Sequence, residues 1–353
     1  MSTVGAELVI RQRTDNVHAN LYVQAAEQLG LTAEVIDREK GVFRISSETK
    51  SLVNHGGALG MNNPVSRAIA NNKITTIRLL SRFGVPVPTS EVFHVDDDLR
   101  HVLTSAKARF PLVVKPVCGQ CGEGVVANIK NESELEAALA ALRALQRETF
   151  ILENHVEGED FRILVCRGEI IDVLKRVPAN VIGDGRSTLE KLIPLRNRER
   201  LAYHHTMSTI DVDTDILDFL EQRGLALGHV PARGQKILLR RICNFSKGGE
   251  VSSVPVSELN PELVDLFKAV QRRIGLAFCG VDYITPNITK SFRDVASCVN
   301  EVNPRPGIQI HCFARPEGIS LDPALKVLET AFRERKGAGG LTARYDGDSS
   351  AHG

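Results

Sequence analysis

The sequence has no excess of either charge and no long hydrophobic run. Its 353 residues carry 44 Lys and Arg against 43 Asp and Glu, a formal net charge of +1. A balance this close to zero gives no electrostatic reason to expect a nucleic acid as a partner. No apolar run approaches the roughly 20 residues of a bilayer-spanning helix, and the opening residues lack the apolar core of a signal peptide. We therefore expect a cytoplasmic protein that binds neither nucleic acid nor membrane.

A disulfide framework is also missing. The seven cysteines are odd in number and scattered, which is typical of reduced thiols. Cys118 and Cys121 form a C-x-x-C pair, but a zinc or redox site needs a second pair or a thioredoxin-like setting. We therefore expect no such role for this pair, since the remaining cysteines are isolated: Cys166, Cys243, Cys279, Cys298 and Cys312.

Two common phosphate-binding motifs are absent as well. No G-x-x-x-x-G-K-[ST] run occurs near Gly119, and Gly119, Gly122 and Gly124 are spaced G-x-x-G-x-G rather than G-x-G-x-x-G. A strand at 125–129, not a helix, is predicted to follow them. The sequence therefore predicts neither a P-loop nor a dinucleotide-binding turn.

A glycine-rich loop between two strands can still present backbone N–H groups to anionic oxygens. This loop follows Lys115, which ends the apolar run PLVVK, and Lys73 lies at another predicted element boundary. The pattern favours a nucleotide clamp of two lysines and a glycine-rich cover. On this segment alone, a surface hairpin with an exposed lysine is the alternative.

Composition and length indicate an ordinary globular enzyme of two or three domains, with 42% hydrophobic and 25% charged residues. Helices are expected to open at two capping boxes, Ser133 with Glu136 and Ser187 with Glu190, and after Asn260-Pro261. The tail after residue 335 is small and polar, which predicts disorder. Other expected helices and strands cover 7–11, 20–29, 33–37, 64–72, 74–83, 150–152, 160–165, 169–175, 215–222 and 237–241.

Two short segments near the C-terminus predict a metal site. Residues 280–285 and 296–302 read as an antiparallel pair of strands. Pairing would bring Asp282 beside Glu301 and Asn303, and the last two share a strand face because they are two apart. Hard cations prefer such oxygen ligands. The alternative is a pair of solvated edge strands.

In combination and in order, these segments resemble the ATP-grasp superfamily over residues 55–318. The chain is most similar to the ATP-grasp region of cyanophycin synthetases, with glutathione synthetase and D-alanine–D-alanine ligase as more distant relatives. The segments that carry the resemblance are NNKITTIRLLSRFGVPVP, PLVVKP, the glycine loop, LENHVEGEDFRILV, KRVPANVIGDGRSTLEKLI, LLRRICNFSKGG and VDYITPN followed by VNEVNPRPGIQIH.

The resemblance implies an α/β (α+β) ATP-grasp fold, in which two subdomains clamp ATP. Residues 1–72 would form an N-terminal α/β domain, 73–155 the central subdomain with the glycine loop, and 156–335 the C-terminal subdomain with the metal and substrate sites. Residues 336–353 would be a disordered tail. ATP and two Mg²⁺ ions, for which Mn²⁺ could substitute, would be the cofactors.

The resemblance also assigns roles to residues. Lys73, Lys115 and the loop with Gly119, Gly122 and Gly124 would hold the ATP phosphates. Glu153 to Val156 would contact adenine, and Asp160 the ribose hydroxyls. Arg162 and Arg176 would face the phosphates or a substrate carboxylate, and Ser246 would contact substrate. Arg240, with Arg176 and Asn244, would stabilise the acyl phosphate and the tetrahedral species. The implied metal ligands are Asp282, Glu301 and Asn303.

Several positions depart from the family pattern. Asn72 and Ile77 replace an acid and a lysine in the first motif, and the family's N-A-A-P-G-L-R-M-H reads N-P-R-P-G-I-Q-I-H here. Arg305 is therefore new, and Gln309 replaces a basic residue. The long N-terminal domain and the Mur-ligase-like domain of cyanophycin synthetases have no counterpart in the sequence. We therefore expect a different, small substrate.

The expected activity is ATP-dependent formation of an amide or peptide bond between small substrates, through an acyl phosphate, with release of ADP and phosphate. The alternatives are a kinase-like phosphotransferase and a catalytically silent nucleotide-binding regulator. Expected partners are a carboxylate and an amine, with a homodimer left open. Arg305, stiffened by Pro304 and Pro306, would bind a substrate carboxylate or else pair with a nearby acid.

Overall fold

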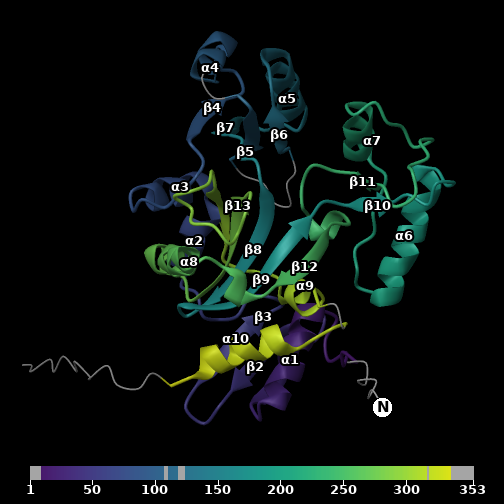
Figure 1. Cartoon of the computed structure of the whole chain (residues 1–353). Coiled ribbons are helices and arrows are strands. Elements are labelled where there is room, and N and C mark those ends of the chain that lie inside the picture. The colour runs from purple at the N-terminus through teal and green to yellow at the C-terminus, as the bar shows by residue number, and fades with distance from the viewer. Residues whose placement is uncertain (1–8, 107–109, 118–123, 316–317, 335–353) are drawn as a thin grey trace, which may run out of the picture.

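The computed structural model describes residues 9–106, 110–117, 124–315 and 318–334, and these form a mixed α/β fold with four antiparallel sheets (Figure 1). The expected fold class is confirmed. Cys118, Gly119, Cys121, Gly122 and the tail 336–353 lie outside the described residues. No helix of the described part is long and apolar enough to cross a bilayer. The predicted domain boundaries stay predictions.

The N-terminal unit packs against the last helices of the described chain rather than standing alone. Tyr22 of α1 and Phe43 of β2 are fully buried together with Leu328 of α10 (Figure 1). The strand expected at 7–11 is absent from residues 9–11. The elements of this unit are α1 (Val17–Gln28), β1 (Thr32–Asp37), β2 (Val42–Ser46), β3 (Ser51–His55), α9 (Ile308–Cys312) and α10 (Asp322–Phe332).

The central sheet has the strand order β4-β7-β5-β6 and lies beside α4 and α5 (Figure 1). The expected stripe of α5 is buried at Leu135, Leu139 and Leu142, whereas Leu145 is 42% exposed beyond the helix end. The predicted Ser133 cap is wrong, because Asn131 accepts the capping bond from the Glu134 N–H. The elements are β4 (Ser90–His94), α4 (Leu99–Ala106), β5 (Leu112–Pro116), β6 (Val126–Ile129), α5 (Glu132–Ala144) and β7 (Thr149–Asn154).

The largest sheet has five strands in the order β12-β9-β8-β13-β14. One face carries apolar side chains such as Phe161, Val281 and Tyr283, which pack with α8 and α3. The other face is covered at one end by α9 and α10 and carries polar side chains at the other. The elements are α2 (Pro64–Asn71), α3 (Lys73–Ser81), β8 (Glu159–Cys166), β9 (Glu169–Val177), β12 (Glu250–Val254), α8 (Pro261–Ile274), β13 (Phe278–Thr285) and β14 (Cys298–Asn303).

A separate lobe stands beside this sheet and has a small core of its own (Figure 1). The predicted Ser187 cap is wrong: α6 follows Thr188, and the Ser187 hydroxyl donates to Asp184. The strand expected at 237–241 ends at Leu238, so Arg240 lies beyond the strand end. The elements are β10 (Asn180–Ile182), α6 (Leu189–Tyr203), α7 (Thr214–Glu221), β11 (Lys236–Leu238) and the 3-10 turns at Phe245–Lys247 and Val256–Glu258.

Candidate functional site

The predicted antiparallel pair near the C-terminus is confirmed as β13 and β14. Asp282 lies directly opposite Glu301, and Gly280 opposite Asn303, so the three predicted metal ligands share one face of the sheet. Their surroundings differ. Glu301 is exposed and forms no ion pair within the described chain, whereas the Asn303 side-chain oxygen accepts a hydrogen bond from the Arg305 N–H at 2.8 Å.

Asp282 is buried between two arginines. It is 3% exposed, and its carboxylate accepts hydrogen bonds from Arg162 Nε and, at 2.9 Å, from Arg162 Nη2. Arg176 Nη2 lies 2.9 Å from the second oxygen. Burial acts to raise the pKa of Asp282, but the two guanidinium groups outweigh it and hold the pKa below its usual value. Arg162 stands opposite Asp282 on β8, so strand register places this pair.

Arg176 connects the same cluster to Asp160. The two residues are opposite each other on β9 and β8, and Arg176 Nε donates to the Asp160 carboxylate at 2.7 Å. Burial raises the pKa of Asp160 to about 6, because it outweighs the attraction of Arg176 and adds to repulsion from Asp282. The predicted ribose and phosphate residues and one predicted metal ligand therefore form a single network of two acids and two arginines.

Lys115 is held by two acceptors. It is 9% exposed, and its Nζ lies 2.5 Å from the Glu153 carboxylate and donates to Asn300 Oδ1 at 2.8 Å. Glu153 is 2% exposed, so its carboxylate faces Lys115 rather than solvent. Asn300 was not among the predicted site residues, since strand alternation alone does not bring it to Lys115. Burial raises the pKa of the nearby Cys298 thiol to about 12. The Lys115 ammonium acts to lower this pKa, and the carboxylates of Glu153 and Asp160 act to raise it.

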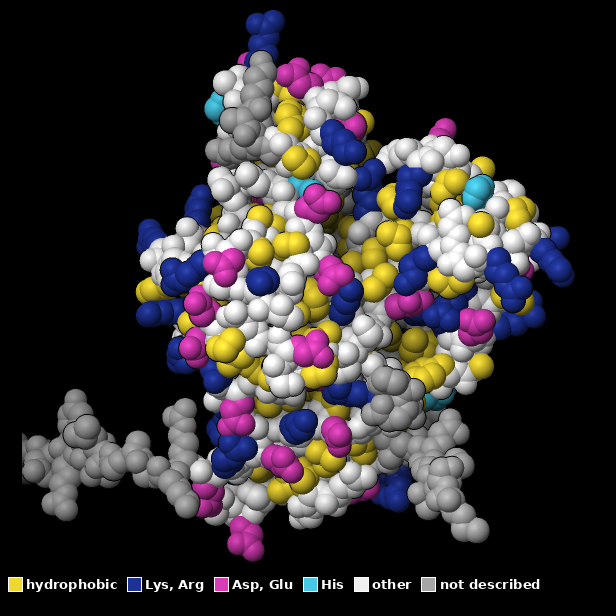
Figure 2. Space-filling view, in the orientation of Figure 1, with side chains coloured by type: hydrophobic (Ala, Val, Ile, Leu, Met, Phe, Trp, Pro, Cys, Tyr) yellow, Lys and Arg dark blue, Asp and Glu magenta, His cyan; other side chains and the backbone are white. Residues whose placement is uncertain are grey.

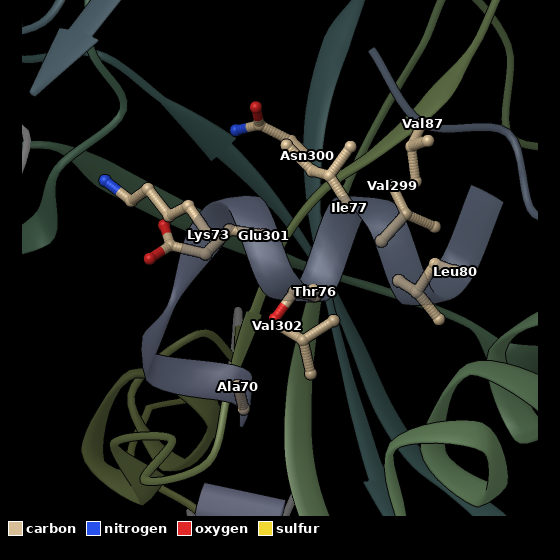
Figure 3. Close-up of a pocket in the computed structure, with 10 residues that line it drawn as sticks. All are labelled: Ala70, Lys73, Thr76, Ile77, Leu80, Val87, Val299, Asn300, Glu301 and Val302. Carbon is tan, nitrogen blue, oxygen red and sulfur yellow. The ribbon is translucent and has the colours of Figure 1, made fainter. Parts of the chain in front are cut away.

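Lys73, at the start of α3, lies next to β14. Figure 3 shows its ammonium and the Glu301 carboxylate extending to the same side, away from Val302 and Leu80. The cavity that these residues line is about 10 Å³, hardly enough for one water molecule. It is therefore not a nucleotide pocket. The arrangement instead places one predicted phosphate lysine beside one predicted metal ligand.

Arg240 is buried in the separate lobe. Its Nη2 donates to Asp213 at 2.8 Å and to the Asp211 carbonyl at 3.0 Å, and its buried Nε has no hydrogen-bond partner among the described residues. Hydrogen bonds thus direct this guanidinium toward acids of its own lobe. The turn that follows Arg240 carries Cys243, which lies near the network of Asp160, Arg176 and Asp282. Burial raises the pKa of the Cys243 thiol to about 12, and the two carboxylates act in the same direction while Arg176 opposes them.

Asn244 and Ser246 share this turn. The Asn244 side-chain oxygen accepts from the Ser246 N–H at 3.0 Å and from its hydroxyl at 2.8 Å. Arg241, which was not predicted, donates to the Ala127 carbonyl of β6 at 3.1 Å. The turn therefore contacts the central sheet as well as the large one.

In Figure 2, hydrophobic side chains are exposed where the surface sinks between the lobe and the main body. A hollow of about 390 Å³ is lined by residues of the lobe and, from the large sheet, by Glu250 of β12. Arg196 bridges Glu199 at 2.6 Å and Glu250 at 2.8 Å there. None of the predicted site residues lines this hollow. The predicted site lies instead at the polar end of the large sheet.

Arg305 and Gln309 follow β14 and face different surroundings. Arg305 is exposed, lies between buried Pro304 and Pro306, and forms no ion pair within the described part of the chain. Gln309 is buried, and its amide donates to the Thr206 hydroxyl at 2.8 Å. Arg305 is therefore free for a ligand in this structure, whereas Gln309 ties the segment to the loop after α6.

The N-terminal unit reaches the same segment through His18. The Gln309 N–H donates to His18 Nδ1 at 3.3 Å, and a Cβ on Gly307 would lie 3.0 Å from His18 Cε1. The glycine of the P-R-P-G run thus allows the imidazole to approach. His204 joins the contact through the Thr206 hydroxyl at 2.8 Å, which gives the His204-His205 region a structural role.

His18 predicts a pH dependence of stability. Burial lowers the pKa of His18 to about 4, whereas an unfolded histidine titrates near 6.5. Between these values the unfolded chain binds a proton that the folded chain does not, so stability falls as the pH falls. We expect a loss of up to about 1.4 kcal/mol per pH unit from this residue. Melting temperatures of wild type and His18→Gln from pH 7.5 to 4.5 test this, and equal slopes would contradict it.

A buried triad fixes α9 to β9. His311 Nδ1 lies 2.8 Å from the Asp172 carboxylate, which also accepts from Arg315 Nη2 at 2.6 Å. Burial, together with the nearby arginines, lowers the pKa of His311 despite Asp172. The neutral imidazole therefore anchors the end of the N-P-R-P-G-I-Q-I-H segment.

Comparison with known proteins places this arrangement in a family. Residues 70–193 match the RimK-like ATP-grasp domain. Cyanophycin synthetase from Crocosphaera subtropica is 32% identical over 286 residues, 80% of this chain and 32% of its own length. The glutathione biosynthesis bifunctional protein GshAB from Streptococcus agalactiae is 28% identical over 318 residues, 87% of this chain and 42% of its own. The chain thus spans about a third of the cyanophycin synthetase it matches.

A solved structure supports the fold. The bifunctional glutathione synthetase from Pasteurella multocida superposes with a TM-score of 0.64 at 23% identity, covering 91% of this chain and 44% of that one. At this identity the likeness shows the fold alone. The superposition and the domain match both support an ATP-grasp fold for the two antiparallel sheets that carry Lys115 and Asp282. The chain therefore contains a RimK-like ATP-grasp domain and belongs to the ATP-grasp superfamily.

Proposed function

We propose that this protein is an ATP-dependent carboxylate–amine ligase that joins two small substrates, at least one of them an amino acid. One observation carries the proposal. Two antiparallel sheets meet with a buried lysine on one and a cluster of two acids and two arginines on the other, and the exposed Glu301 carboxylate lies across the strand from one of those acids. Such a junction suits a polyphosphate with its metal ions.

The proposed reaction has two steps. A substrate carboxylate oxygen attacks the γ-phosphorus of ATP, the bond to the β-phosphate bridging oxygen breaks, and ADP leaves. The amine nitrogen of the second substrate then attacks the acyl carbon, loses a proton, and expels phosphate as the carbon–oxygen bond breaks. No side chain of the protein forms a covalent bond, so catalysis rests on positioning and charge stabilisation.

Lys115 and Lys73 would hold the phosphates as point charges, and the backbone N–H groups of the glycine-rich segment 119–124 would add hydrogen-bond donors. Arg162 and Arg176 are already beside Asp282 and would turn toward phosphate or substrate carboxylate. Arg240 and Asn244 would stabilise the charged intermediate, provided Arg240 exchanges its contact with Asp213. Residues 153–156 would contact adenine through their backbone, since the Glu153 side chain holds Lys115.

The oxygen donors of Asp282, Glu301 and Asn303 fit magnesium in type and in shared face. Within the described residues, no three His, Cys, Asp or Glu side chains gather as a ready-made metal site, so phosphate and water oxygens would complete the coordination. Bound magnesium would neutralise the phosphates. Asp282 would first have to release Arg162 and Arg176, whereas Glu301 has no ion-pair partner to release among the described residues.

An ADP-release assay over pairs of amino acids tests the proposal. ADP formation should require a carboxylate substrate, and the amide product should require the amine. Binding of ATP without any carboxylate-dependent ADP would overturn it. The kinase alternative is separated by hydroxylamine trapping, because an acyl phosphate yields a hydroxamate and other phosphorylated products do not.

Arg305 should set the affinity for one substrate. Arg305 is exposed and forms no ion pair within the residues that the structure describes, and the prolines on either side stiffen its backbone. Its guanidinium can therefore bind a carboxylate through two hydrogen bonds. Arg305→Lys keeps the charge and loses the second bond. A contact of this kind contributes about 1.5–3 kcal/mol, so the KM for one amino acid should rise about ten- to a hundred-fold.

The KM for ATP serves as the internal control for Arg305→Lys, because the side chain is not placed at the nucleotide. It should change less than about twofold, a difference below 0.5 kcal/mol. Equal weakening toward ATP and both substrates would contradict the assignment. So would a lower melting temperature with unchanged kinetics.

A further inference from the structure

The three N–H bonds of the Lys115 ammonium are not equivalent in this structure. One donates to the Asn300 side-chain oxygen at 2.8 Å, and the ammonium forms an ion pair with the Glu153 carboxylate at 2.5 Å. A lysine ammonium has three donors in tetrahedral geometry. Because the ion pair with Glu153 holds the nitrogen in place and the hydrogen bond to Asn300 fixes one donor direction, the ammonium cannot rotate freely and its remaining donors keep a set direction. With Glu153 alone, the ammonium could still rotate about the contact with that acid.

Asn300 reaches Lys115 because β14 contains a bulge. Asp282 pairs with Glu301 and Tyr283 pairs with Val299, which leaves Asn300 without an opposite residue. An extra residue bends a strand and redirects its side chain. Figure 3 shows the Asn300 amide and the neighbouring Glu301 carboxylate extending in different directions from β14. The strand therefore offers one group to Lys115 and the next to the proposed metal site.

The contact also joins the two sheets. Lys115 and Glu153 lie on β5 and β7 of the central sheet, whereas Asn300 lies on β14 of the large sheet. Lys115 and Glu153 are a buried ion pair with most of their surface removed from solvent. A buried ammonium with a free donor is costly unless a ligand takes that donor. The remaining N–H is thus suited to an anionic ligand at the junction.

We propose that Asn300 is a positioning residue for nucleotide binding, which fixes the Lys115 ammonium so that its third N–H meets a phosphate oxygen of a nucleoside triphosphate. This inference rests on the proposed function, since it takes the junction to be the nucleotide site. Asn300 acts through Lys115 and touches no reacting atom. Its removal should therefore weaken nucleotide binding in the ground state and the transition state alike, raising KM with kcat nearly unchanged.

Asn300→Leu tests the proposal, because leucine has a similar volume and no acceptor. We expect the Kd of a non-hydrolysable ATP analogue with Mg²⁺, measured by calorimetry, to rise about tenfold, the loss of one hydrogen bond to a charged group. The KM for ATP should rise by a similar factor and kcat should change less than about twofold. Ser297→Ala is the matched control: it removes the 2.7 Å hydrogen bond from the Tyr283 hydroxyl nearby and should leave the Kd unchanged.

A double-mutant cycle shows whether Asn300 acts through Lys115. In a Lys115→Met background, Asn300→Leu should have little further effect on the Kd, because the group it positions is gone. Wild-type affinity in Asn300→Leu, or the same loss with and without Lys115, would overturn the inference while leaving the proposed function intact. A wild-type protein that binds no nucleotide would overturn both. Binding is measured without turnover, so a missing second substrate does not affect the result.

Discussion

Glu301→Gln should reduce turnover by about a hundredfold or more while leaving the fold intact. The substitution keeps size and shape but removes the carboxylate charge opposite Asp282. If Glu301 holds metal against the phosphates, several kcal/mol of transition-state stabilisation depend on it. Steady-state ADP release at saturating ATP and magnesium measures the effect.

The absence of any ion pair to Glu301 within the described chain makes this variant a clean test. Removing its charge leaves no buried group without its partner, so the melting temperature should stay within about 1 °C of wild type, less than the shift for 1 kcal/mol in a chain of this length. Titration with Mn²⁺ in the presence of a non-hydrolysable ATP analogue should show weaker metal binding. Near-normal turnover with the usual magnesium requirement would exclude Glu301 as a ligand.

The pairing of β13 with β14 was predictable from sequence because the signals were local. Alternation from Val281 to Thr285 and the break at Asn303-Pro304 set the pairing, and strand periodicity placed Glu301 and Asn303 on one face. The same logic gave the β8–β9 hairpin, whose turn has positive φ at Arg167 and Gly168. Strand alternation and turn residues are therefore enough to predict which residues of one strand share a face and where a hairpin turns.

The partners of the site residues could not be predicted. That Asp282 is held by Arg162 and Arg176 depends on which strands are neighbours, and chain order does not give the order β9-β8-β13. The bulge at Asn300 shifts one residue against strand alternation, so no period reveals it. Arg240 was expected to stabilise the acyl phosphate and the tetrahedral species, and its ion pair with Asp213 of its own lobe could not be foreseen from the sequence.

The predicted N-caps of two helices were wrong because nearby polar residues compete for the same position. Ser133 and Ser187 each have a glutamate three residues later, yet Asn131 caps α5, and the Ser187 hydroxyl bonds to Asp184 instead. Short polar side chains compete for the same backbone donors, so several candidates in one stretch leave the cap ambiguous. The N-terminal unit shows the limit of local reasoning, because the helix that covers α1 is the last one in the described chain.

The second large effect concerns Asp282, and here the expected loss is one of stability as well as activity. Asp282→Asn keeps the shape but removes the charge that two arginines share in a site 3% exposed to solvent. Arg162 and Arg176 would then depend on Asp160 alone. Breaking one partner out of a buried ion pair costs about 3–5 kcal/mol. Unlike Glu301→Gln, this variant should melt roughly 4–7 °C lower than wild type.

Replacing Arg162, which loses its carboxylate partner in Asp282→Asn, should restore part of that stability. In Asp282→Asn with Arg162→Met, one unpaired guanidinium is replaced by an apolar side chain, so the double variant should be more stable than the two single losses added together predict. Differential scanning fluorimetry of the four proteins without nucleotide gives the coupling. Turnover should stay absent in the double variant, because a proposed metal ligand is still missing. Wild-type melting of Asp282→Asn would mean that the arginines do not depend on this carboxylate, and additive losses would mean that Arg162 and Asp282 act independently.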